Sequence, residues 1–285
     1  MTVIAYAGPD EREEVAQFMN TVFTRAKWDI DGWRRLVAGR WCGPNGRYAI
    51  TVRDAGKLVG VLGLIYAVRQ TEAGPRVIAD MTSWYILRPY RAQGVGQKML
   101  ALATADPDVT VSNFSSAKAA VSVLTNAGFQ VLDAERLVWR SGHGAGVVVA
   151  HDDPASVGQG LTAKDKQIIA DHEGLKVRPV RVETPDGPLL MMIYPQKKHD
   201  EYVTHEVMYL SDQALFAQHA PQIAGAVLPV REAILSLDRR FAIPGLQHDE
   251  VHAFATPRFY FAGPMAKSEI DMLYSECLLL NIKIH

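Results

Sequence analysis

One stretch of the chain, Asp80 to Leu100, restricts most strongly what the rest can fold into. Its first part, Asp80 to Leu87, is rich in β-branched and aromatic residues and predicts a strand. From Gly94 onward, apolar residues recur at roughly helical spacing, which predicts a helix. Gly94 and Gly96 lie between the two elements, and such glycines let the backbone approach a ligand closely.

The beginning of this predicted helix is suited to a phosphate or a pyrophosphate. The first N–H groups of a helix have no acceptor within it, and the helix dipole adds partial positive charge there. Arg91 and Lys98 add formal positive charge on either side of the glycines. The stretch therefore predicts an anion site, although an ordinary strand-to-helix turn can carry two glycines as well.

The same stretch resembles the pyrophosphate loop of the GCN5-related N-acetyltransferases, which bind acyl-coenzyme A. That loop has the pattern Arg/Gln-x-x-Gly-x-Gly/Ala after a strand, and here it runs from Arg91 to Gly96. Three neighbouring features match the family too: Ile86 at the apolar position before the loop, the aromatic-Arg pair Tyr90-Arg91, and the Gly128-Phe129 pair that follows the family's fourth helix.

The order of predicted elements agrees with this resemblance, which covers about residues 1–140. It reads strand, two helices, three strands, helix, strand, helix, strand. We therefore expect an α/β fold with a mixed sheet, in which residues 1–142 form an acyl-CoA-binding catalytic domain of the acetyltransferase type. Residues 143–160 are predicted to be a linker, and residues 161–285 a second α/β domain.

The second half repeats the central order strand, strand, helix, strand. Where the phosphate loop would lie, the second half has Ser211-Asp212-Gln213-Ala214. This segment has no glycine pair, and the acid Asp212 stands where an anion would bind. The chain thus resembles tandem acetyltransferases with one half that has lost coenzyme binding. Unrelated α+β domains show the same order of elements, so that alternative stays open. A helix is predicted from Ser268 to Leu280.

The resemblance also implies where the coenzyme binds. In the family the fourth strand separates from the fifth, and acyl-CoA lies in the gap with its pantetheine arm paired to strand backbone, here Trp84 to Arg88. The residues expected to bind acetyl-CoA or another acyl-CoA are Trp84, Ile86, Arg88, Arg91, Ala92, Gln93, Gly94, Val95, Gly96, Gln97, Lys98 and Asn113.

The expected reaction is direct attack of an amine on the thioester, which needs alignment, a proton acceptor and stabilisation of the oxyanion. No histidine precedes His143, so the first domain has no imidazole base. Asp80 lies six residues before Ile86, at the family's position for a carboxylate base, which is usually Glu. Because Asp is one methylene shorter, it would act through a water. Pairing with an arginine or capping the strand is the alternative role for Asp80.

The departing thiolate lacks the family's usual proton donor. Many relatives supply a tyrosine four residues before the Gly-Phe pair, but this chain has Leu124 there, and Ala117 replaces a small polar coenzyme contact. The proton must then come from Tyr85, Ser122 or water, and Tyr85 is the catalytic candidate. The missing tyrosine also favours a coenzyme-binding sensor or structural protein without turnover, and acyl transfer to a hydroxyl is a third alternative.

Several other residues are weaker candidates. In the family the first helical region lines the acceptor side, so Trp28, Trp33 and Trp41 can contact substrate, although tryptophan more often lies in a core. The polar run Tyr274-Ser275-Glu276 interrupts an apolar stretch and can reach an acceptor pocket or be hydrogen-bonded within a partly buried helix. Cys42 has no nearby histidine and is a poor candidate nucleophile.

Composition limits the partners. A net charge of −1 gives no general attraction to nucleic acid or to an anionic membrane, so neither is expected as a partner. The resemblance implies a small-molecule or peptide acceptor, and a homodimer is allowed. The two cysteines form no disulfide framework, and the N-terminus does not resemble a signal peptide, so we expect the cytoplasm. The pairs His199/His205 and His248/His252 lack the cysteine or carboxylate partners of a zinc site, so no metal is expected.

Overall fold

The computed structural model describes residues 2–43, 46–142, 146–198 and 202–284, which divide into two compact units. Unit 1 comprises the chain up to Leu132 together with Thr256–Ile270 and Tyr274–Ile284, and unit 2 comprises Asp133–Ala255 and Asp271–Leu273. This division differs from the predicted boundaries, because C-terminal segments pack with the N-terminal elements. The predicted linker 143–160 also contains regular structure, the strand β7 (Val149–His151) and the helix α5 (Pro154–Val157).

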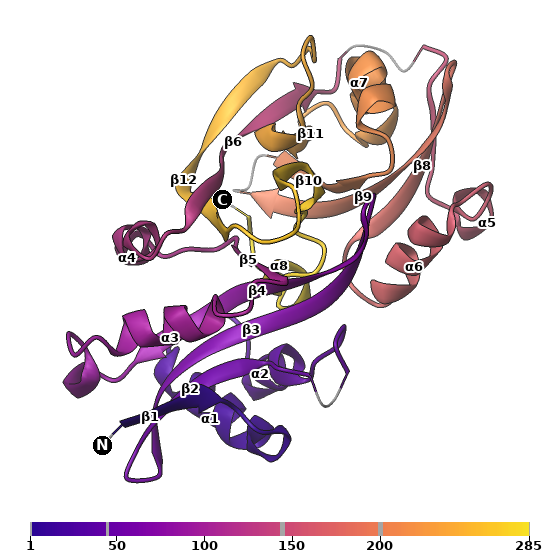
Figure 1. Ribbon diagram of the computed structural model, residues 1–285. Coiled ribbons are helices and arrows are strands. Elements are labelled where there is room, and N and C mark those ends of the chain that lie inside the picture. The colour runs from indigo at the N-terminus through magenta and orange to yellow at the C-terminus, as the bar shows by residue number, and fades with distance from the viewer. Residues whose placement is uncertain (1, 44–45, 143–145, 199–201, 285) are drawn as a thin grey trace. The chain divides into compact units, whose positions relative to one another are not determined.

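Unit 1 contains a mixed sheet in which β1, β2, β3, β4, β5 and β12 follow one another (Figure 1). All neighbouring strands are antiparallel except β4 and β5, which are parallel. Their bounds are β1 (Thr2–Tyr6), β2 (Ala49–Asp54), β3 (Lys57–Thr71), β4 (Gly74–Ile86), β5 (Val109–Asn113) and β12 (Glu250–Phe261), whose part from Thr256 onward belongs to unit 1. The prediction of an α/β fold with a mixed sheet is confirmed.

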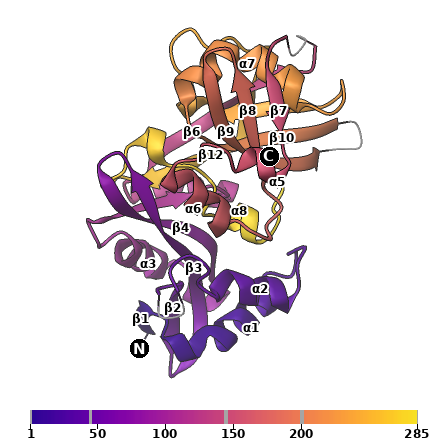
Figure 2. The same ribbon diagram turned by 90° about the vertical axis from the view of Figure 1, so that its right-hand side faces the viewer.

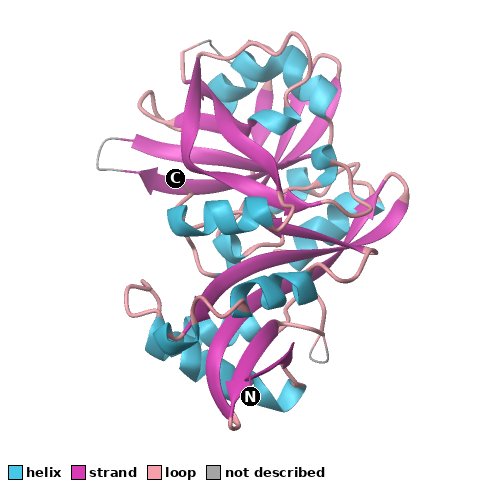
Figure 3. Ribbon diagram, turned by 60° about the vertical axis from the view of Figure 1, so that its left-hand side comes forward, coloured by secondary structure: helices cyan, strands magenta, loops and turns pink. Residues whose placement is uncertain are grey.

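Helices lie on both faces of this sheet (Figure 3). Leu62 and Leu64 of β3 belong to the core cluster under α3 and α4, whereas Gly63 between them faces Leu36 of α2, as the alternation of side chains along a strand requires. Figure 2 shows α3 on one side of β2 and β3, and α1 and α2 on the other. The bounds are α1 (Arg12–Val22), α2 (Ile30–Val37), α3 (Val95–Ala103), α4 (Val121–Asn126) and α8 (Glu276–Leu279).

The strands of unit 2 form the part of the sheet that runs in the order β7, β8, β9, β10, β11, β6. The helix α7 covers it, and Phe216 of α7 packs edge-to-face on Trp139 with their ring centroids 5.4 Å apart. The remaining bounds are β6 (Gln130–Arg140), β8 (Arg178–Thr184), β9 (Gly187–Lys198), β10 (Tyr202–Leu210), β11 (Ile234–Asp238), α6 (Ala163–Asp171) and α7 (Gln213–Val227).

The two units repeat one topology. In each unit the first four strands pair antiparallel, and the fourth strand then pairs in parallel with the fifth. A helix connects these two parallel strands, α3 in unit 1 and α7 in unit 2. A sixth strand pairs antiparallel with the fifth. The sixth strand comes from the other half of the chain in both cases, β12 in unit 1 and β6 in unit 2. This repetition supports the interpretation of the second half as another acetyltransferase-like fold.

The predicted helix from Ser268 to Leu280 is wrong. Only a single turn, Lys267–Glu269, and the short α8 are helical, and between them Ile270 is extended and the Asp271 carboxylate accepts from Leu273 N–H at 3.0 Å. The apolar spacing arose because this irregular segment is buried, with Ile270 and Leu273 fully enclosed. A segment that is buried on several sides can show the same spacing of apolar residues as a helix.

Candidate functional site

The two parallel strands of unit 1 separate halfway along β4. The register pairs Val77 with Val109 and ends at Asp80 with Ser112, whereas β4 continues to Ile86. Just past the last pair, the side-chain amide of Asn113 donates to the Met81 carbonyl at 2.7 Å. Beyond this point the described residues pair β4 with β3 alone, so the other edge of β4 is open.

A β-bulge bends β4 within this open part. The pairing with β3 shifts between Val61 and Gly63, and Ser83 opposite has a φ of +48°. A left-handed conformation costs a non-glycine residue about 1 kcal/mol, and bulges of this kind redirect side chains. The Ser83 side chain consequently lines a pocket next to the strand.

The open edge is shorter than predicted. β4 ends at Ile86, and Leu87 N–H donates to the Val59 carbonyl of β3 at 2.9 Å. Arg88 begins a short 3₁₀ turn, Arg88–Tyr90, because Pro89 has no N–H to continue a ladder. Trp84 to Ile86 therefore belong to the strand, while Arg88 does not and is exposed.

The glycine loop has the predicted geometry. Gly94 caps α3 with a φ of +71°, and the first helical hydrogen bond joins Lys98 N–H to the Gly94 carbonyl at 3.1 Å. The amides of Val95, Gly96 and Gln97 thus have no acceptor within the helix. A Cβ added to Gly94 would meet no protein atom within 4 Å, so the loop faces open space there.

Gly96 serves a different purpose from Gly94. A Cβ added at Gly96 would lie 2.9 Å from Cζ2 of Trp84, which is closer than real Cβ contacts. The second glycine therefore lets the start of α3 pack directly against the open end of β4. This packing brings Trp84 of the strand next to Gly96 of the loop.

The polar side chains of the loop stabilise its own backbone. Arg91 Nε–H donates to the Ile86 carbonyl at 2.8 Å, and Gln93 donates to the Pro89 carbonyl at 2.8 Å. Gln97 and Lys98 are exposed, as is Ala92, whose φ of +60° tightens the turn. Lys98 is thus the exposed cation on the first turn of α3.

Asn113 makes two hydrogen bonds within the protein. Its amide nitrogen bonds Met81, and its amide oxygen accepts from the Ser116 hydroxyl. Both ends of the amide are occupied within the protein, so Asn113 fixes β5 to β4 at the point where they separate. The sequence predicted Asn113 as a coenzyme contact because this residue ends β5. Its hydrogen bonds to Met81 and Ser116 depend on the tertiary structure and could not be predicted.

Asp80 lies at the fork between the two strands and is almost fully buried, with 1% of its surface exposed. Its carboxylate accepts from the Ser112 hydroxyl at 3.3 Å and from Glu276 N–H at 3.3 Å. Burial raises the pKa of Asp80 from its ordinary 3.8 to about 8, although these hydrogen bonds oppose the rise.

A second carboxyl group, Glu276, lies next to Asp80. It begins α8, is 4% exposed, and accepts a hydrogen bond from the Ser115 hydroxyl. Burial, and next the negative charge of Asp80, raise the pKa of Glu276 well above its ordinary value. Two buried acids this close titrate as a pair, and the protein holds protons there that water would remove from an exposed carboxylate.

Aromatic contacts hold the C-terminal segment of unit 1 in place. The Arg69 guanidinium lies 4.2 Å from the centroid of the Tyr274 ring, and the Trp41 ring packs edge-on against Tyr274 at 5.1 Å. Trp41 therefore positions the segment that carries Glu276. The adjacent Cys277 is 3% exposed, and burial raises the pKa of its thiol.

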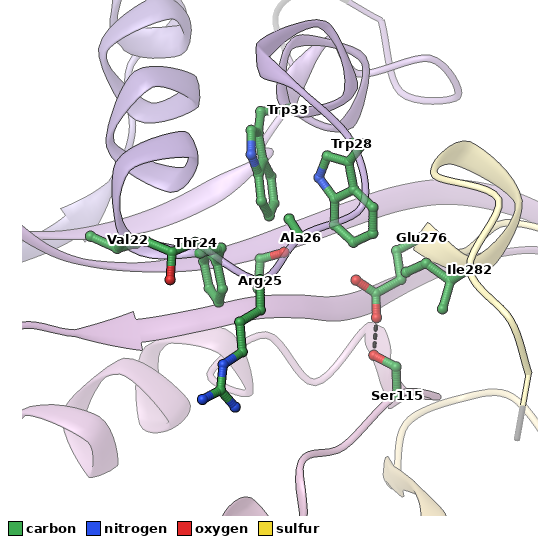
Figure 4. Close-up of a pocket in the computed structure, with 11 residues that line it drawn as sticks. Val22, Thr24, Arg25, Ala26, Trp28, Trp33, Ser115, Glu276 and Ile282 are labelled. Carbon is green, nitrogen blue, oxygen red and sulfur yellow. Dashed lines mark hydrogen bonds between the residues drawn. The ribbon is translucent and has the colours of Figure 1, made fainter.

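A pocket of about 480 Å³ opens beside the fork (Figure 4). We call it the Trp28 pocket. It is lined by Val22, Phe23, Thr24, Arg25, Ala26, Trp28, Trp33, Ser83, Ser115, Glu276 and Ile282. Ser83 comes from the open part of β4 and Ser115 lies two residues after β5, so the pocket adjoins the gap between these strands. Asp80 does not line it, whereas Glu276 does.

Sequence reasoning found part of this pocket. Trp28 and Trp33 were named as acceptor contacts and Glu276 as reaching an acceptor pocket, and all three line it. The sequence does not single out Phe23 or Ser83, because Phe23 is one of several apolar residues in its helical region and no residue pattern marks the bulge at Ser83. An acid inside an apolar stretch was the one signal that pointed to Glu276.

The other catalytic candidates lie elsewhere. The Tyr85 ring contacts the ring of Phe23, with centroids 5.6 Å apart, but Tyr85 does not line the pocket. Leu124 is buried in the core cluster of unit 1, so the usual tyrosine is replaced by a packing residue. Burial raises the pKa of the Cys42 thiol, which disfavours the reactive thiolate.

Histidines and acidic residues form no metal centre in the described parts of the chain. No three His, Cys, Asp or Glu side chains there are close enough to hold an ion. Of the two histidine pairs, His199 lies outside the described residues, and His252 pairs with Glu250 at 2.7 Å.

Unit 2 contains an altered copy of the fork. Glu206 on β10 lies opposite Ser236 on β11, as Asp80 lies opposite Ser112, and the Ser236 hydroxyl donates to it. Here, however, Arg136 forms a buried ion pair with Glu206 at 2.6 Å. The N-terminus of α7 is occupied by its own Asp212, which accepts from Leu215 N–H at 2.8 Å, as expected from the acid in this loop.

Comparison with solved structures identifies the fold. A GCN5-related N-acetyltransferase from Anabaena variabilis matches 91% of this chain and 72% of its own, with a TM-score of 0.54 and 9% identity. Eis1 from Mycobacterium abscessus matches 91% and 73%, with a TM-score of 0.51 and 12% identity. A GCN5-related N-acetyltransferase from Kribbella flavida matches 91% and 70%, with a TM-score of 0.52 and 11% identity.

The chain thus has the fold of the GCN5-related N-acetyltransferases. No protein-family model matches the sequence, and no curated protein matches it. Within the described residues, no helix combines the length and the apolar character needed to span a membrane.

Proposed function

We propose that this protein is an acyl-CoA-dependent acyltransferase that transfers an acetyl group to an amine. The observation that carries the proposal is the fork at Asp80 and Ser112, where β4 continues with an open edge toward the glycine loop at the start of α3. An open strand edge offers backbone groups to the amides of a pantetheine arm. The free amides of α3 offer hydrogen bonds to a pyrophosphate.

The coenzyme would extend along the edge of Trp84 to Ile86, with its pyrophosphate at Gly94 to Lys98. Its thioester would then reach the fork, next to the Trp28 pocket. Unit 1 is the catalytic unit in this proposal. In unit 2 the corresponding acid is paired with Arg136, and the corresponding helix start is occupied by Asp212.

Acetyl-CoA is expected to raise the melting temperature of the protein, because a ligand that binds only the folded state stabilises it. With Gly94→Ala, the same rise in melting temperature should need at least ten times more acetyl-CoA, since the added methyl group would project toward the phosphates. Gly56→Ala is the matched control. Gly56 lies in the turn between β2 and β3, has a φ of +78°, and would likewise meet no atom within 4 Å. If both variants respond equally to acetyl-CoA, the loop is not the pyrophosphate site.

A coenzyme-binding sensor without turnover is the second candidate, and buried Leu124 in place of the usual tyrosine favours it. Thiol release in the presence of amines separates the two. Stabilisation by acetyl-CoA without thiol release from any amine or alcohol would support the sensor. Thiol release in the presence of alcohols, and none in the presence of amines, would support acyl transfer to a hydroxyl group.

A further inference from the structure

The Trp28 pocket combines an aromatic wall with a buried acid. The rings of Phe23 and Trp33 lie 5.2 Å apart between centroids, and those of Trp28 and Trp33 lie 5.1 Å apart. Figure 4 shows the two indoles on one side and the Glu276 carboxyl, bonded to Ser115, on the other. Aromatic faces attract organic cations, and a desolvated carboxylate attracts them further.

The shape and charge of the pocket narrow its ligand. A volume of about 480 Å³ suits a small molecule. Hydroxyl groups of a sugar would lose hydrogen bonds against the aromatic wall, which costs free energy. An anionic ligand would face Glu276 and, behind it, Asp80. Arg25 also lines the pocket, but its guanidinium points away from the Glu276 carboxyl (Figure 4).

We propose that the Trp28 pocket binds the acyl acceptor, that this acceptor is a primary amine on an apolar, ring-bearing body, and that Glu276 takes the proton from its ammonium group. The proposal rests on the acyl transfer proposed above and defines its acceptor. The ring packs against Phe23 and Trp28, which the buried Trp33 supports from behind, and the nitrogen lies at Glu276 and Ser115, facing the fork.

The proposed step balances as follows. The Glu276 carboxylate accepts one proton from the ammonium and passes it to water. The neutral nitrogen forms a bond to the acyl carbon, and the bond between that carbon and sulfur breaks. The nitrogen loses its second proton to the departing thiolate, so the products are the amide, free coenzyme A thiol and one proton.

Asp80 is a positioning residue in this scheme. The Asp80 side chain accepts from the backbone N–H of Glu276, which fixes the start of α8. The other ionisable groups near Glu276 are Arg25 at the pocket, the adjacent Cys277, and Arg258 of β12, which acts on the Cys277 thiol. Because the acid pair must lose a proton before Glu276 can act, kcat/KM should rise with pH through neutrality.

Calorimetry with the full chain tests the acceptor class. The probes are 2-phenylethylamine, its uncharged analogue 2-phenylethanol, its anionic analogue 3-phenylpropionate, and ethylamine, which lacks the ring. We expect 2-phenylethylamine to bind at least tenfold more tightly than each of the other three. Equal binding of the four probes, or preference for the alcohol or the acid, would overturn the proposal.

Two variants assign the roles. Glu276→Gln should abolish the preference for amine over alcohol and flatten the pH profile of kcat/KM, and Trp28→Ala should abolish the preference for 2-phenylethylamine over ethylamine. The control is Glu269→Gln, in the same C-terminal part of unit 1, where the carboxylate accepts from Ala266 N–H at 2.9 Å. It should change neither preference. If Glu276→Gln behaves like this control, Glu276 is not the base.

A third variant tests the position of Trp28 without removing it. A Cβ added at Gly32 would lie 2.5 Å from Cδ1 of Trp28, so Gly32→Ala must move the indole. The KM for the amine should rise while the response to acetyl-CoA stays unchanged. An unchanged KM would contradict the placement of the ring.

The two proposals fail separately. Stabilisation of every variant by acetyl-CoA with no binding of 2-phenylethylamine would overturn the acceptor assignment and leave acyl transfer standing. Amine binding without any effect of acetyl-CoA would overturn acyl transfer and leave an amine-binding pocket.

Discussion

The substitution Asp80→Asn should change how the stability of the protein depends on pH. The amide has nearly the same shape as the carboxyl and still accepts a hydrogen bond from Glu276 N–H, but it does not ionise. In the folded protein burial raises the pKa of Asp80 from 3.8 to about 8. Between these two values the folded chain keeps a proton that the unfolded chain has released.

The sign and size of the effect follow from this difference. Since the unfolded state binds fewer protons, the free energy of unfolding falls as the pH rises from about 4 to about 8. One carboxyl that keeps its proton over this range lowers the free energy of unfolding by roughly 3 kcal/mol between pH 5 and pH 7. Asp80→Asn should remove that contribution and leave the one from Glu276, which titrates together with Asp80 in the natural protein.

Urea unfolding of both proteins at half-unit steps from pH 5 to pH 8 measures the two slopes. Glu13→Gln is a control in which the pKa shift has the opposite sign, because hydrogen bonds from Arg34 lower the pKa of Glu13 to about 2. A carboxyl with a lowered pKa contributes stability that is lost only as the pH falls below its ordinary value, so this control should run parallel to the natural protein above pH 5. Parallel curves for Asp80→Asn as well would refute the assignment of a protonated, buried Asp80.

Two further predictions follow from the buried charge of unit 2 and from the thiols. Arg136→Leu should destabilise the protein by about 3–5 kcal/mol in urea unfolding, because it leaves Glu206 buried without its ion-pair partner, and adding Glu206→Leu should restore most of the loss. A double variant no more stable than the single one would contradict this explanation. Cys277 is 3% exposed and has a raised pKa, so iodoacetamide should label at most Cys42 in the folded protein and both thiols in urea; labelling of two thiols without denaturant would show that the C-terminal segment opens.

The internal repeat shows how one fold supports different roles. Both units place an acid opposite a serine on a parallel strand pair. An arginine in contact with the acid makes it an internal ion pair in unit 2, at Arg136 and Glu206. In unit 1 the neighbour of Asp80 is instead a second acid, Glu276; burial raises the pKa values of both, and the charge of Asp80 raises that of Glu276 further. The difference is what makes the fork of unit 1 the place where proton transfer is expected.

The sequence alone determined the local features of this protein. The strand before Gly94, the glycine-containing turn and the helix after it depend on residues close in the chain, so composition and spacing predicted them. The acid at Asp212, where α7 begins, was equally visible, because a helix cap is a local contact. The likeness of the first half to an acetyltransferase depended on these local patterns.

Only the tertiary structure decided the rest. Residues 196 positions apart meet where Glu276 N–H bonds Asp80, and no local pattern encodes such a contact. The same holds for β12, which joins the sheet of unit 1 from the far end of the chain, and for the Trp28 pocket, which unites α1, α2, β4 and α8. The stretch from Asp80 to Lys98 thus predicted a coenzyme site from local pattern alone, while the long-range packing of the C-terminal segment decided that Glu276 lines the pocket.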